Sequence, residues 1–345
     1  GVECFAHLRG MFAIALWDRR SNELVLARDR LGKKPLFYSQ TSFGLSFSSE
    51  LHSLLCDHEI QREIDPTAID EYLSYLFVPH PRTIYRDVKK LPPATWAVFS
   101  DGQLLMERYW QVEYREEPEK SSLQERVEAL DGLMREAVSL RLLADVPVGA
   151  FLSGGLDSSL VVALMRSVGH ERVRTFSIGF SDSSFDELAY ARQVAQVLDT
   201  DHAEYVVDYQ VEDVIPSLLK HFGEPFADSS AIPTYHLSRL TRESVTVALS
   251  GDGGDEVFGG YRRYQARIMA DRYNRWPAWA GRSLFESLCE SVPEPDGYYG
   301  RSWRKKGRRF VEFTRAVREE PHTSWAFFLP KTKKLRCIRK ILPIT

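Results

Sequence analysis

The chain has 345 residues and a net charge of -3, with 27% charged and 43% hydrophobic residues. This length suffices for two compact domains of an ordinary globular protein. A charge so close to zero gives no reason to expect a nucleic-acid partner, and no apolar run approaches the roughly 20 residues that span a bilayer. We therefore expect neither a nucleic-acid nor a membrane partner.

The four cysteines, Cys4, Cys56, Cys289 and Cys337, form no C-x-x-C pair, so the sequence suggests neither a zinc site nor a redox dithiol. Scattered thiols fit a reducing compartment, and the front of the chain has no basic-then-apolar leader, so we expect a cytoplasmic protein. The chain opens at Gly1 rather than Met and enters a strand-like run almost at once. We interpret it as a fragment of a longer protein.

The first half of the chain predicts short antiparallel strands. Apolar runs at residues 12–17, 24–27, 35–38 and 45–47 are separated by turn residues, and a short helix is predicted near 50–55. Residues 57–120 are mixed and punctuated by prolines, and they end in a charged stretch. We therefore predict a front domain over residues 1–110, a linker over 111–121 and a second domain over 122–345.

From Ser122 onward the pattern alternates between helices and strands. Ser122 and Glu125 have capping-box spacing ahead of a helical apolar pattern, and Ser184 and Glu187 repeat that spacing before a second helix. The other predicted elements are strands at 146–152, 173–180, 203–207 and 245–249 and helices at 160–168, 211–221 and 233–242. Such alternation predicts a doubly wound parallel sheet, which binds ligands beyond the carboxyl ends of its strands.

A glycine turn, S-G-G-L-D-S-S at residues 153–159, follows the first of these strands. Its glycines permit unusual backbone angles and close approach of a ligand, and the N–H groups of the turn and of the next helix form an anion cradle. Asp157 suits a phosphate site only with a divalent cation, because its carboxylate can then hold Mg²⁺ against the phosphate oxygens. No G-K-[ST] follows, so this is not a Walker loop. The alternative is a plain turn in which Asp157 caps the helix.

A second glycine loop follows strand 245–249 and carries Asp252, Asp255 and Glu256 within five residues. Three carboxylates this close repel one another unless they are solvated or bound to a metal. Alone, the loop is equally well explained as a solvated acidic turn. Because both loops follow buried strands, we interpret them as two halves of one Mg-ATP site.

Together the loops resemble the ATP-pyrophosphatase family, and more specifically the synthetase domain of glutamine-dependent asparagine synthetases. The resemblance rests on S-G-G-L-D-S-S, on L-S-G-D-G-G-D-E-V-F-G-G-Y at 249–261, on D-S-S-A-I-P at 228–233 and on T-F-S-I-G-F at 175–180. It implies an α/β fold whose C-terminal part is a doubly wound parallel sheet of the ATP-pyrophosphatase (adenine nucleotide alpha hydrolase-like) type. The part before it is implied to be the later half of an N-terminal-nucleophile glutaminase domain.

The resemblance also implies roles for single residues. Asp157 and Asp255 are implied to hold Mg²⁺, and Asp252 stands where the family has an acid, often Glu, that is linked to formation of β-aspartyl-AMP. The shorter Asp is a departure that leaves its role open. The implied ATP-binding residues are Leu152, Ser153, Gly154, Gly155, Asp157, Ser158, Ser159, Ile178, Ser250 and Gly251.

The front of the chain resembles the family's glutaminase domain at residues 8–13 and 27–36. We interpret Arg28 and Asp29 as a structural ion pair rather than as glutamine contacts. The family's terminal nucleophilic cysteine and its later active-site lysine are not found, and Cys4 is not in the nucleophile's context. We therefore expect a fragment that lacks both ends and does not hydrolyse glutamine.

The sequence thus predicts an asparagine synthetase-like ligase that uses ATP and Mg²⁺. Its substrates are expected to be ATP, aspartate or another carboxylate, and glutamine in the full-length protein; a homodimer is left open. One alternative is a related amidotransferase with a β-lactam-type or cell-surface-polymer acceptor, and another is a nucleotide-binding fragment without catalysis. Basic clusters at 301–309 and 331–340 would suit nucleic acid, but the overall charge argues against that partner.

Overall fold

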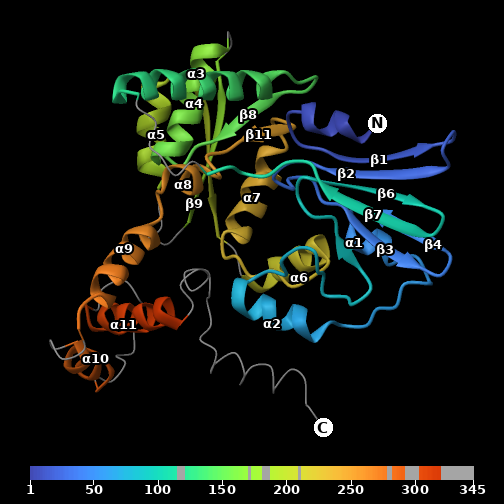
Figure 1. Cartoon of the computed structure of the whole chain (residues 1–345). Helices are drawn as coiled ribbons and strands as arrows, with labels where there is room; N and C mark the ends of the chain where they lie inside the picture. The colour runs from blue at the N-terminus through green and yellow to red at the C-terminus, as the bar shows by residue number, and fades with distance from the viewer. Residues whose placement is uncertain are drawn as a thin grey trace. The chain divides into compact units, whose positions relative to one another are not determined.

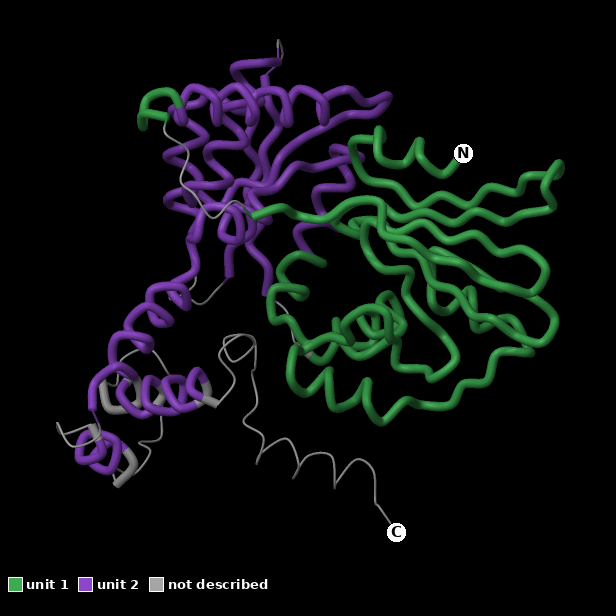
Figure 2. Tube along the Cα trace, in the orientation of Figure 1, with its two compact units in different colours: residues 1–125, 209–235, 328–345 green, residues 126–208, 236–327 purple. Residues whose placement is uncertain are grey.

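A computed structural model describes residues 1–114, 121–169, 172–180, 187–208, 211–277, 282–291 and 303–319. The chain divides into two compact units (Figure 2). The first unit contains Gly1–Glu125 and Tyr209–Tyr235, and the second contains Arg126–Asp208 and His236–Phe327. The first unit therefore includes a segment, Tyr209–Tyr235, that a division at the predicted linker would place in the second domain.

Two antiparallel sheets form most of the first unit (Figure 1). One has the strand order β1 (Ala13–Asp18), β2 (Glu23–Arg28), β6 (Thr95–Ser100), β7 (Gln103–Arg108), and the other has the order β4 (Gly44–Ser48), β3 (Phe37–Thr41), β5 (Lys89–Lys90). The helical segments are η1 (Val2–His7), α1 (Leu51–Leu54), α2 (Pro66–Tyr75) and α6 (Val211–Phe222). The four strands predicted before residue 50 are present, although β3 begins only at Phe37.

Arg28 and Asp29 brace the loop that follows β2. The Asp29 carboxylate, in a residue only 1% exposed, accepts backbone N–H bonds. Their donors are Phe12, Leu31, Lys33 and Lys34. The Arg28 guanidinium donates instead to backbone carbonyls, those of Gly32, Lys34 and Leu91, each at 2.7 Å. Both residues therefore have a structural role, and each hydrogen-bonds to backbone groups. The described contacts do not include the predicted ion pair between them.

A four-stranded parallel sheet forms the centre of the second unit, as predicted. Its order is β10 (Asp201–Val207), β9 (Arg174–Phe180), β8 (Val148–Phe151), β11 (Val247–Leu249). Figure 1 shows α3 (Leu123–Leu142), α4 (Leu156–Val168) and α5 (Leu188–Val197) on one side of this sheet and α7 (Ala231–Thr241) on the other. The remaining helices are α8 (Gly254–Phe258), α9 (Arg262–Asn274), α10 (Arg282–Ser291) and α11 (Trp303–Glu319).

The core of this unit lies between the sheet and α3, α4 and α5. Ala150 and Leu152 from the β8 region and Val162 from α4 are at most 1% exposed, and they pack with Val138 of α3 and Ala191 of α5. Burying apolar area of this kind contributes about 25 cal/mol per Å². The packing of β8 against α4 therefore fixes the turn between them, which is the predicted nucleotide loop.

The two predicted capping boxes have different outcomes. The Ser122 N–H donates to Glu125 Oε2 at 2.7 Å, and the Glu125 N–H donates to Ser122 Oγ at 3.2 Å, so the first box is confirmed. The second lies partly outside the described residues: Glu187 is the residue just before α5 and makes no side-chain cap bond there. Its predicted partner Ser184 lies outside the described residues. No helix in the described ranges is long and apolar enough to cross a membrane.

Candidate nucleotide site

The first loop leaves the sheet in a defined direction. β8 ends at Phe151, and the Leu152 N–H still donates to the Phe176 carbonyl at 2.9 Å, while the Leu152 carbonyl accepts from the Ser177 hydroxyl. Leu152 is 1% exposed and its side chain lies in the core, so the predicted ATP contact is not one that this side chain makes. Ser177, which sequence analysis did not single out, belongs to the quoted T-F-S-I-G-F motif.

The serines of the loop divide into two groups. Ser153 Oγ lies 2.9 Å from Ser158 Oγ and accepts the Gly155 N–H at 3.2 Å, and Ser158 Oγ accepts the Ser153 N–H at 3.3 Å. These two hydroxyls hold the turn itself. The Ser159 hydroxyl, in contrast, is buried and has no hydrogen-bond partner among the described residues. Leaving a buried polar atom without a hydrogen bond costs free energy. The Ser159 hydroxyl is therefore suited to donate a hydrogen bond to a ligand oxygen.

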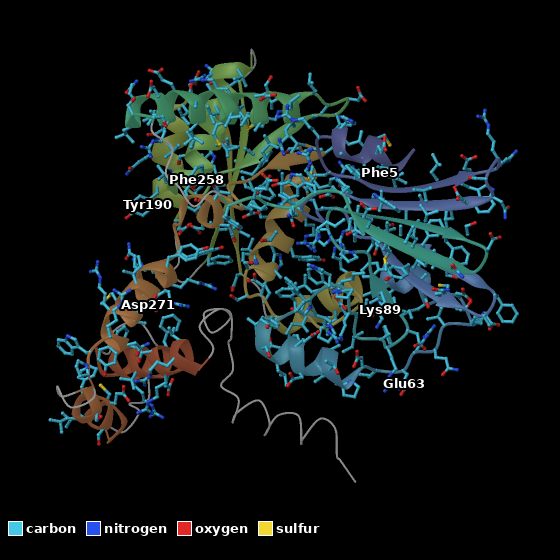
Figure 3. The ribbon with its side chains drawn as sticks, in the orientation of Figure 1. Phe5, Glu63, Lys89, Tyr190, Phe258 and Asp271 are labelled. Atoms are coloured by element: carbon cyan, nitrogen blue, oxygen red, sulfur yellow. The ribbon has the colours of Figure 1, made fainter. Side chains whose placement is uncertain are left out.

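Gly154 allows the loop to pack against the start of α5. Its φ is +77°, and a Cβ there would lie 2.5 Å from the Ala191 nitrogen and from the Tyr190 carbonyl carbon, which are backbone atoms. Tyr190 is labelled in Figure 3. Any side chain at this position would therefore meet both conformational strain and a backbone clash. The glycine predicted for close approach is needed by the protein's own packing, independently of a ligand.

The amino end of α4 is available to an anion. Gly155 is the residue before the helix, and the described structure shows no side-chain cap bond at that end. Asp157 is the second residue of the helix, so the alternative in which it acts as the helix cap is wrong. Unsatisfied N–H groups and the helix dipole make such an end favourable for phosphate.

The second loop follows β11 directly. The Ser250 hydroxyl donates to Asp252 Oδ2 at 2.9 Å and accepts the Asp252 N–H at 3.4 Å, so Ser250 fixes the exposed Asp252 side chain. Gly253, at φ +93°, then turns the chain into α8, and Asp255 and Glu256 lie in the first turn of that helix. The three predicted acids are therefore presented on a short turn and on one helical turn.

The two loops meet at glycines. A Cβ on Gly251 would lie 2.7 Å from the Ser158 nitrogen, and a Cβ on Gly254 would lie 2.5 Å from Asp157 Cγ. The Asp157 carboxylate therefore lies against the first residue of α8, next to Asp255 in sequence. The structure thus brings together the two loops that the sequence predicted to form one site.

The acids of α8 have neighbours that sequence analysis did not use. A Cβ on Gly260 would overlap the Asp255 carboxylate, so the G-G-Y turn packs against that side chain. The Tyr261 hydroxyl donates to Glu256 Oε1 at 2.6 Å, and this hydrogen bond is the main reason that the pKa of Tyr261 rises to about 12. The G-G-Y letters were part of the quoted motif and contained this signal.

The donor set suits Mg²⁺ rather than zinc. Within the described residues, no group of three or more His, Cys, Asp or Glu side chains is arranged to hold a metal. Mg²⁺ typically uses one or two carboxylates together with phosphate oxygens and water. Asp157 and Asp255 are compatible with that pattern, and their role as metal ligands stays a prediction, as does the adenine contact of Ile178, which lies part-buried on β9 opposite Tyr205.

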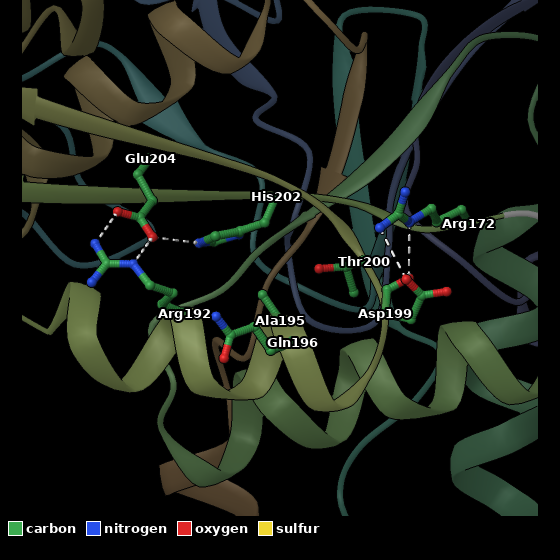
Figure 4. Close-up of a pocket in the computed structure, with 8 residues that line it drawn as sticks. All are labelled: Arg172, Arg192, Ala195, Gln196, Asp199, Thr200, His202 and Glu204. Atoms are coloured by element: carbon green, nitrogen blue, oxygen red, sulfur yellow. Dashed lines mark hydrogen bonds and ion pairs between the residues drawn. The ribbon is translucent and has the colours of Figure 1, made fainter.

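A cavity of about 420 Å³ lies elsewhere on the second unit, between α5 and β10 (Figure 4). Its charged groups pair with one another: Arg192 contacts Glu204 at 2.6 Å and Arg172 contacts Asp199 at 2.9 Å. His202 Nδ1 lies 2.8 Å from Thr175 Oγ1, and burial lowers the pKa of His202. None of the predicted nucleotide residues lines this cavity, which has no excess charge to attract phosphate.

The basic clusters are only partly described. Arg304, Lys305, Lys306, Arg308 and Arg309 belong to α11, where Arg308 Nε lies 3.3 Å from Glu312 one helical turn away. Arg301 and residues 331–340 lie outside the described residues. Cys4, Cys56 and Cys289 are free thiols, and Cys337 also lies outside the described part.

Comparison with known proteins identifies the family of both parts of the chain. The asparagine synthase family model matches residues 129–335, and a glutamine amidotransferase domain model matches residues 1–110. Asparagine synthetase [glutamine-hydrolyzing] 1 of Bacillus subtilis is 34% identical over 310 residues, which cover 88% of this chain and 48% of that protein. A putative asparagine synthetase of Methanocaldococcus jannaschii is 38% identical over 284 residues, 80% of this chain and 54% of that protein.

The chain spans about half the length of the curated relatives it matches. Amidase chyE of Penicillium rubens is 30% identical over 297 residues, 81% of this chain and 44% of that protein. Among solved structures, an NH3-dependent NAD synthetase from Campylobacter jejuni has 17% identity and a TM-score of 0.27 over 41% of this chain and 61% of that chain, which is too low to support an argument. The family models and the curated relatives show that the chain belongs to the asparagine synthase family.

Proposed function

We propose that this chain carries the nucleotide-activating part of a cytoplasmic, ATP-dependent ligase that amidates a carboxylate. The favoured acceptor is aspartate, which would become asparagine with ammonia derived from glutamine in the full-length protein. The observation that carries the proposal is the meeting of the two loops, in which the Asp157 carboxylate lies against Gly254 of the second loop. The family membership and the synthetase-named relatives support the same reaction class.

The chemistry would proceed in two displacements. An acceptor carboxylate oxygen attacks the α-phosphorus of ATP, an acyl-adenylate forms and pyrophosphate leaves. Ammonia then attacks the acyl carbon, the C–O bond to AMP breaks and an amide forms, with loss of a proton. Adenylation supplies the leaving group that a free carboxylate lacks, and positioned positive charge stabilises the departing pyrophosphate.

The residues of the two loops have separate roles in this scheme. The amino end of α4 and the Ser159 hydroxyl would bind phosphate oxygens. Asp157 and Asp255 would hold Mg²⁺, which supplies charge neutralisation at the pyrophosphate. Asp252, held by Ser250, is proposed to act during formation of the acyl-adenylate. Cys4, an exposed thiol, is not proposed as a glutaminase nucleophile, so glutamine hydrolysis is not assigned to these 345 residues.

The acceptor is the part of the proposal with a specific rival. The 30% identity to a protein named an amidase favours a second candidate, a related amidotransferase with a different acceptor. Pyrophosphate release from ATP by the full-length protein, measured with a panel of amino acids and other carboxylates, separates the two. Release that depends on aspartate supports asparagine synthesis, and release that depends on another carboxylate supports the rival. ATP binding without release for any acceptor would leave only a nucleotide-binding role.

A further inference from the structure

A buried ion pair in the first unit holds the segment Tyr209–Tyr235. The residues that precede and follow this segment in the sequence belong to the second unit. Lys90 Nζ is paired with Glu224 Oε1, and the two side chains are only 15% and 11% exposed. Burial lowers the pKa of Lys90 and raises that of Glu224, and each partner acts against that shift in the other. Neither residue belongs to the nucleotide loops, and neither was singled out in the sequence.

Both partners are also bound to backbone, which fixes their positions. Glu224 Oε2 accepts the Ile84 N–H at 3.2 Å, and Lys90 Nζ donates to the Val78 carbonyl. A buried ion pair is stable only when such further hydrogen bonds satisfy its polar atoms. The carboxylate at position 224 is therefore fixed against two separate stretches of the first unit.

Two contacts beside Glu224 fasten the same short stretch. Gly223, at φ +71°, ends α6, and a Cβ there would lie 3.1 Å from Leu51 Cβ of α1. The Ala227 N–H donates to the carbonyl of Leu76, the left-handed residue that ends α2, at 2.8 Å. Residues 223–227 are thus held by three contacts, at Gly223, Glu224 and Ala227. The contact at Glu224 is the ion pair with Lys90.

The family motif D-S-S-A-I-P begins at the next residue. Asp228 forms a turn in which its carboxylate accepts the Ser230 N–H at 2.9 Å and its carbonyl accepts the Ala231 N–H at 3.1 Å. α7 starts at Ala231 and runs without a break to Thr241, and its second half, from His236, belongs to the second unit. The motif follows residues 223–227 directly in the chain and lies in the same unit, so the position of 223–227 sets the position of the motif.

We propose that Lys90 and Glu224 are a positioning pair, which fixes the Asp228–Pro233 turn and the start of α7 from within the first unit. Loss of the pair should lower turnover in the ligase reaction without weakening ATP binding, because the nucleotide loops lie wholly in the second unit. The consequence for turnover rests on the proposed function, whereas the anchoring of residues 211–235 does not.

Hydrogen exchange on the whole chain tests the anchoring. Lys90→Met and Glu224→Gln should each raise amide exchange across residues 211–235 by roughly tenfold or more, with little change in β8 and β9. The matched control is Arg86→Met with Glu63→Gln: these two residues are also paired, at 2.7 Å, in the first unit, but each side chain is 53% exposed. Glu63 is labelled in Figure 3. An exposed pair contributes little, so the control should match wild type.

The double variant Lys90→Met/Glu224→Gln separates positioning from simple stability. It removes both buried charges and keeps an acceptor for the Ile84 N–H. If the pair only stabilises the fold, the double variant should behave like wild type, since no unpaired charge remains. Positioning predicts that exchange across 211–235 stays raised and that acceptor-dependent pyrophosphate exchange stays low, with the Kd for ATP within about twofold of wild type.

Three results would overturn the inference. They are unchanged amide hydrogen exchange in both single variants, a rise in hydrogen exchange that is spread evenly over the first unit, or a return of hydrogen exchange to the wild-type rate in the double variant. Glu224→Gln keeps the shape of the side chain, so it serves if Lys90→Met does not fold. If the wild-type protein shows no acceptor-dependent pyrophosphate exchange at all, the proposed function fails. Hydrogen exchange alone then tests the anchoring.

Discussion

Two glycine-containing loops, one in each unit, use a carboxylate in opposite ways. Around Asp29 the carboxylate is used by the protein itself: it accepts four backbone N–H groups, and the neighbouring Arg28 donates to three carbonyls. Around Asp157 the helix end has no side-chain cap in the described structure, and the buried Ser159 hydroxyl has no described partner. An acid beside a glycine turn does not by itself indicate a site; what distinguishes the Asp157 loop is the uncapped helix end beside it, which an anion can use.

The largest expected effect concerns the satisfied loop. Asp29→Ala should lower the free energy of unfolding by about 3 kcal/mol or more, because it leaves several buried N–H groups without an acceptor. Asp18→Ala is the control, since the hydrogen bond of the Asp18 carboxylate in the described structure is to the exposed Arg20 N–H. Urea unfolding of both variants measures the difference. If Asp29→Ala costs no more than Asp18→Ala, the Asp29 hydrogen bonds are not what holds this loop.

Asp157→Asn should spare stability and weaken ATP binding instead. We expect roughly a tenfold loss of ATP affinity in the presence of Mg²⁺ and little change without it, because the proposed partner of the carboxylate is the metal and not the phosphate. Calorimetry with and without Mg²⁺ measures both values on folded protein. Equal weakening in the two conditions would remove the metal role.

The contact between the loops can be tested with two adjacent glycines. Gly254→Ala places a methyl group 2.5 Å from Asp157 Cγ, whereas a Cβ on Gly253 meets nothing within 4 Å. Gly253→Ala therefore tests only the strain of its φ of +93°, and Gly254→Ala tests the space between the loops. We expect Gly254→Ala to reduce ATP affinity several-fold more than Gly253→Ala. Equal losses, measured by the same titration, would mean that backbone strain rather than the contact matters.

The smallest effect concerns His202, whose Nδ1 is bonded to Thr175 and whose buried Nε2 lies 3.6 Å from Glu204 Oε1. Burial lowers the pKa of His202 in the folded state. The folded protein therefore binds fewer protons than the unfolded chain, and the contribution to stability is present above about pH 6.5 and is lost as the pH falls from there through the folded pKa. His202→Gln should flatten this part of the curve of unfolding free energy against pH. An unchanged slope would show that His202 does not contribute.

Local pattern predicted the second unit better than the first. Its buried strands and apolar helices alternate along the chain, so the parallel sheet and the proximity of the two glycine loops followed from the sequence. In the first unit the hairpin β6–β7 was missed, although Asp101-Gly102, both at positive φ, is a strong hairpin signal between its strands. Helix α2 was also missed, although Asp65 caps it by accepting the Thr67 N–H and Pro66 is its first residue.

Other features depend on tertiary contacts that no local pattern contains. Leu152 was predicted to contact ATP, and only the packing of β8 against α4 shows that its side chain is used in the core. Residues 209–235 belong to the first unit and contact residues more than a hundred positions earlier in the chain, among them Lys90 and Leu76.

The meeting of the two loops at glycine backbone has a consequence for motion. A Cβ on Gly251 would lie 2.7 Å from the Ser158 backbone nitrogen, whereas the nearest atoms to a Cβ on Gly254 belong to the Asp157 side chain. Closer approach of the loops is therefore limited by backbone at Gly251, but at Gly254 it depends on a side chain that can change rotamer. We expect the spacing of the loops to stay nearly constant at Gly251 and to vary with the rotamer of Asp157 at Gly254.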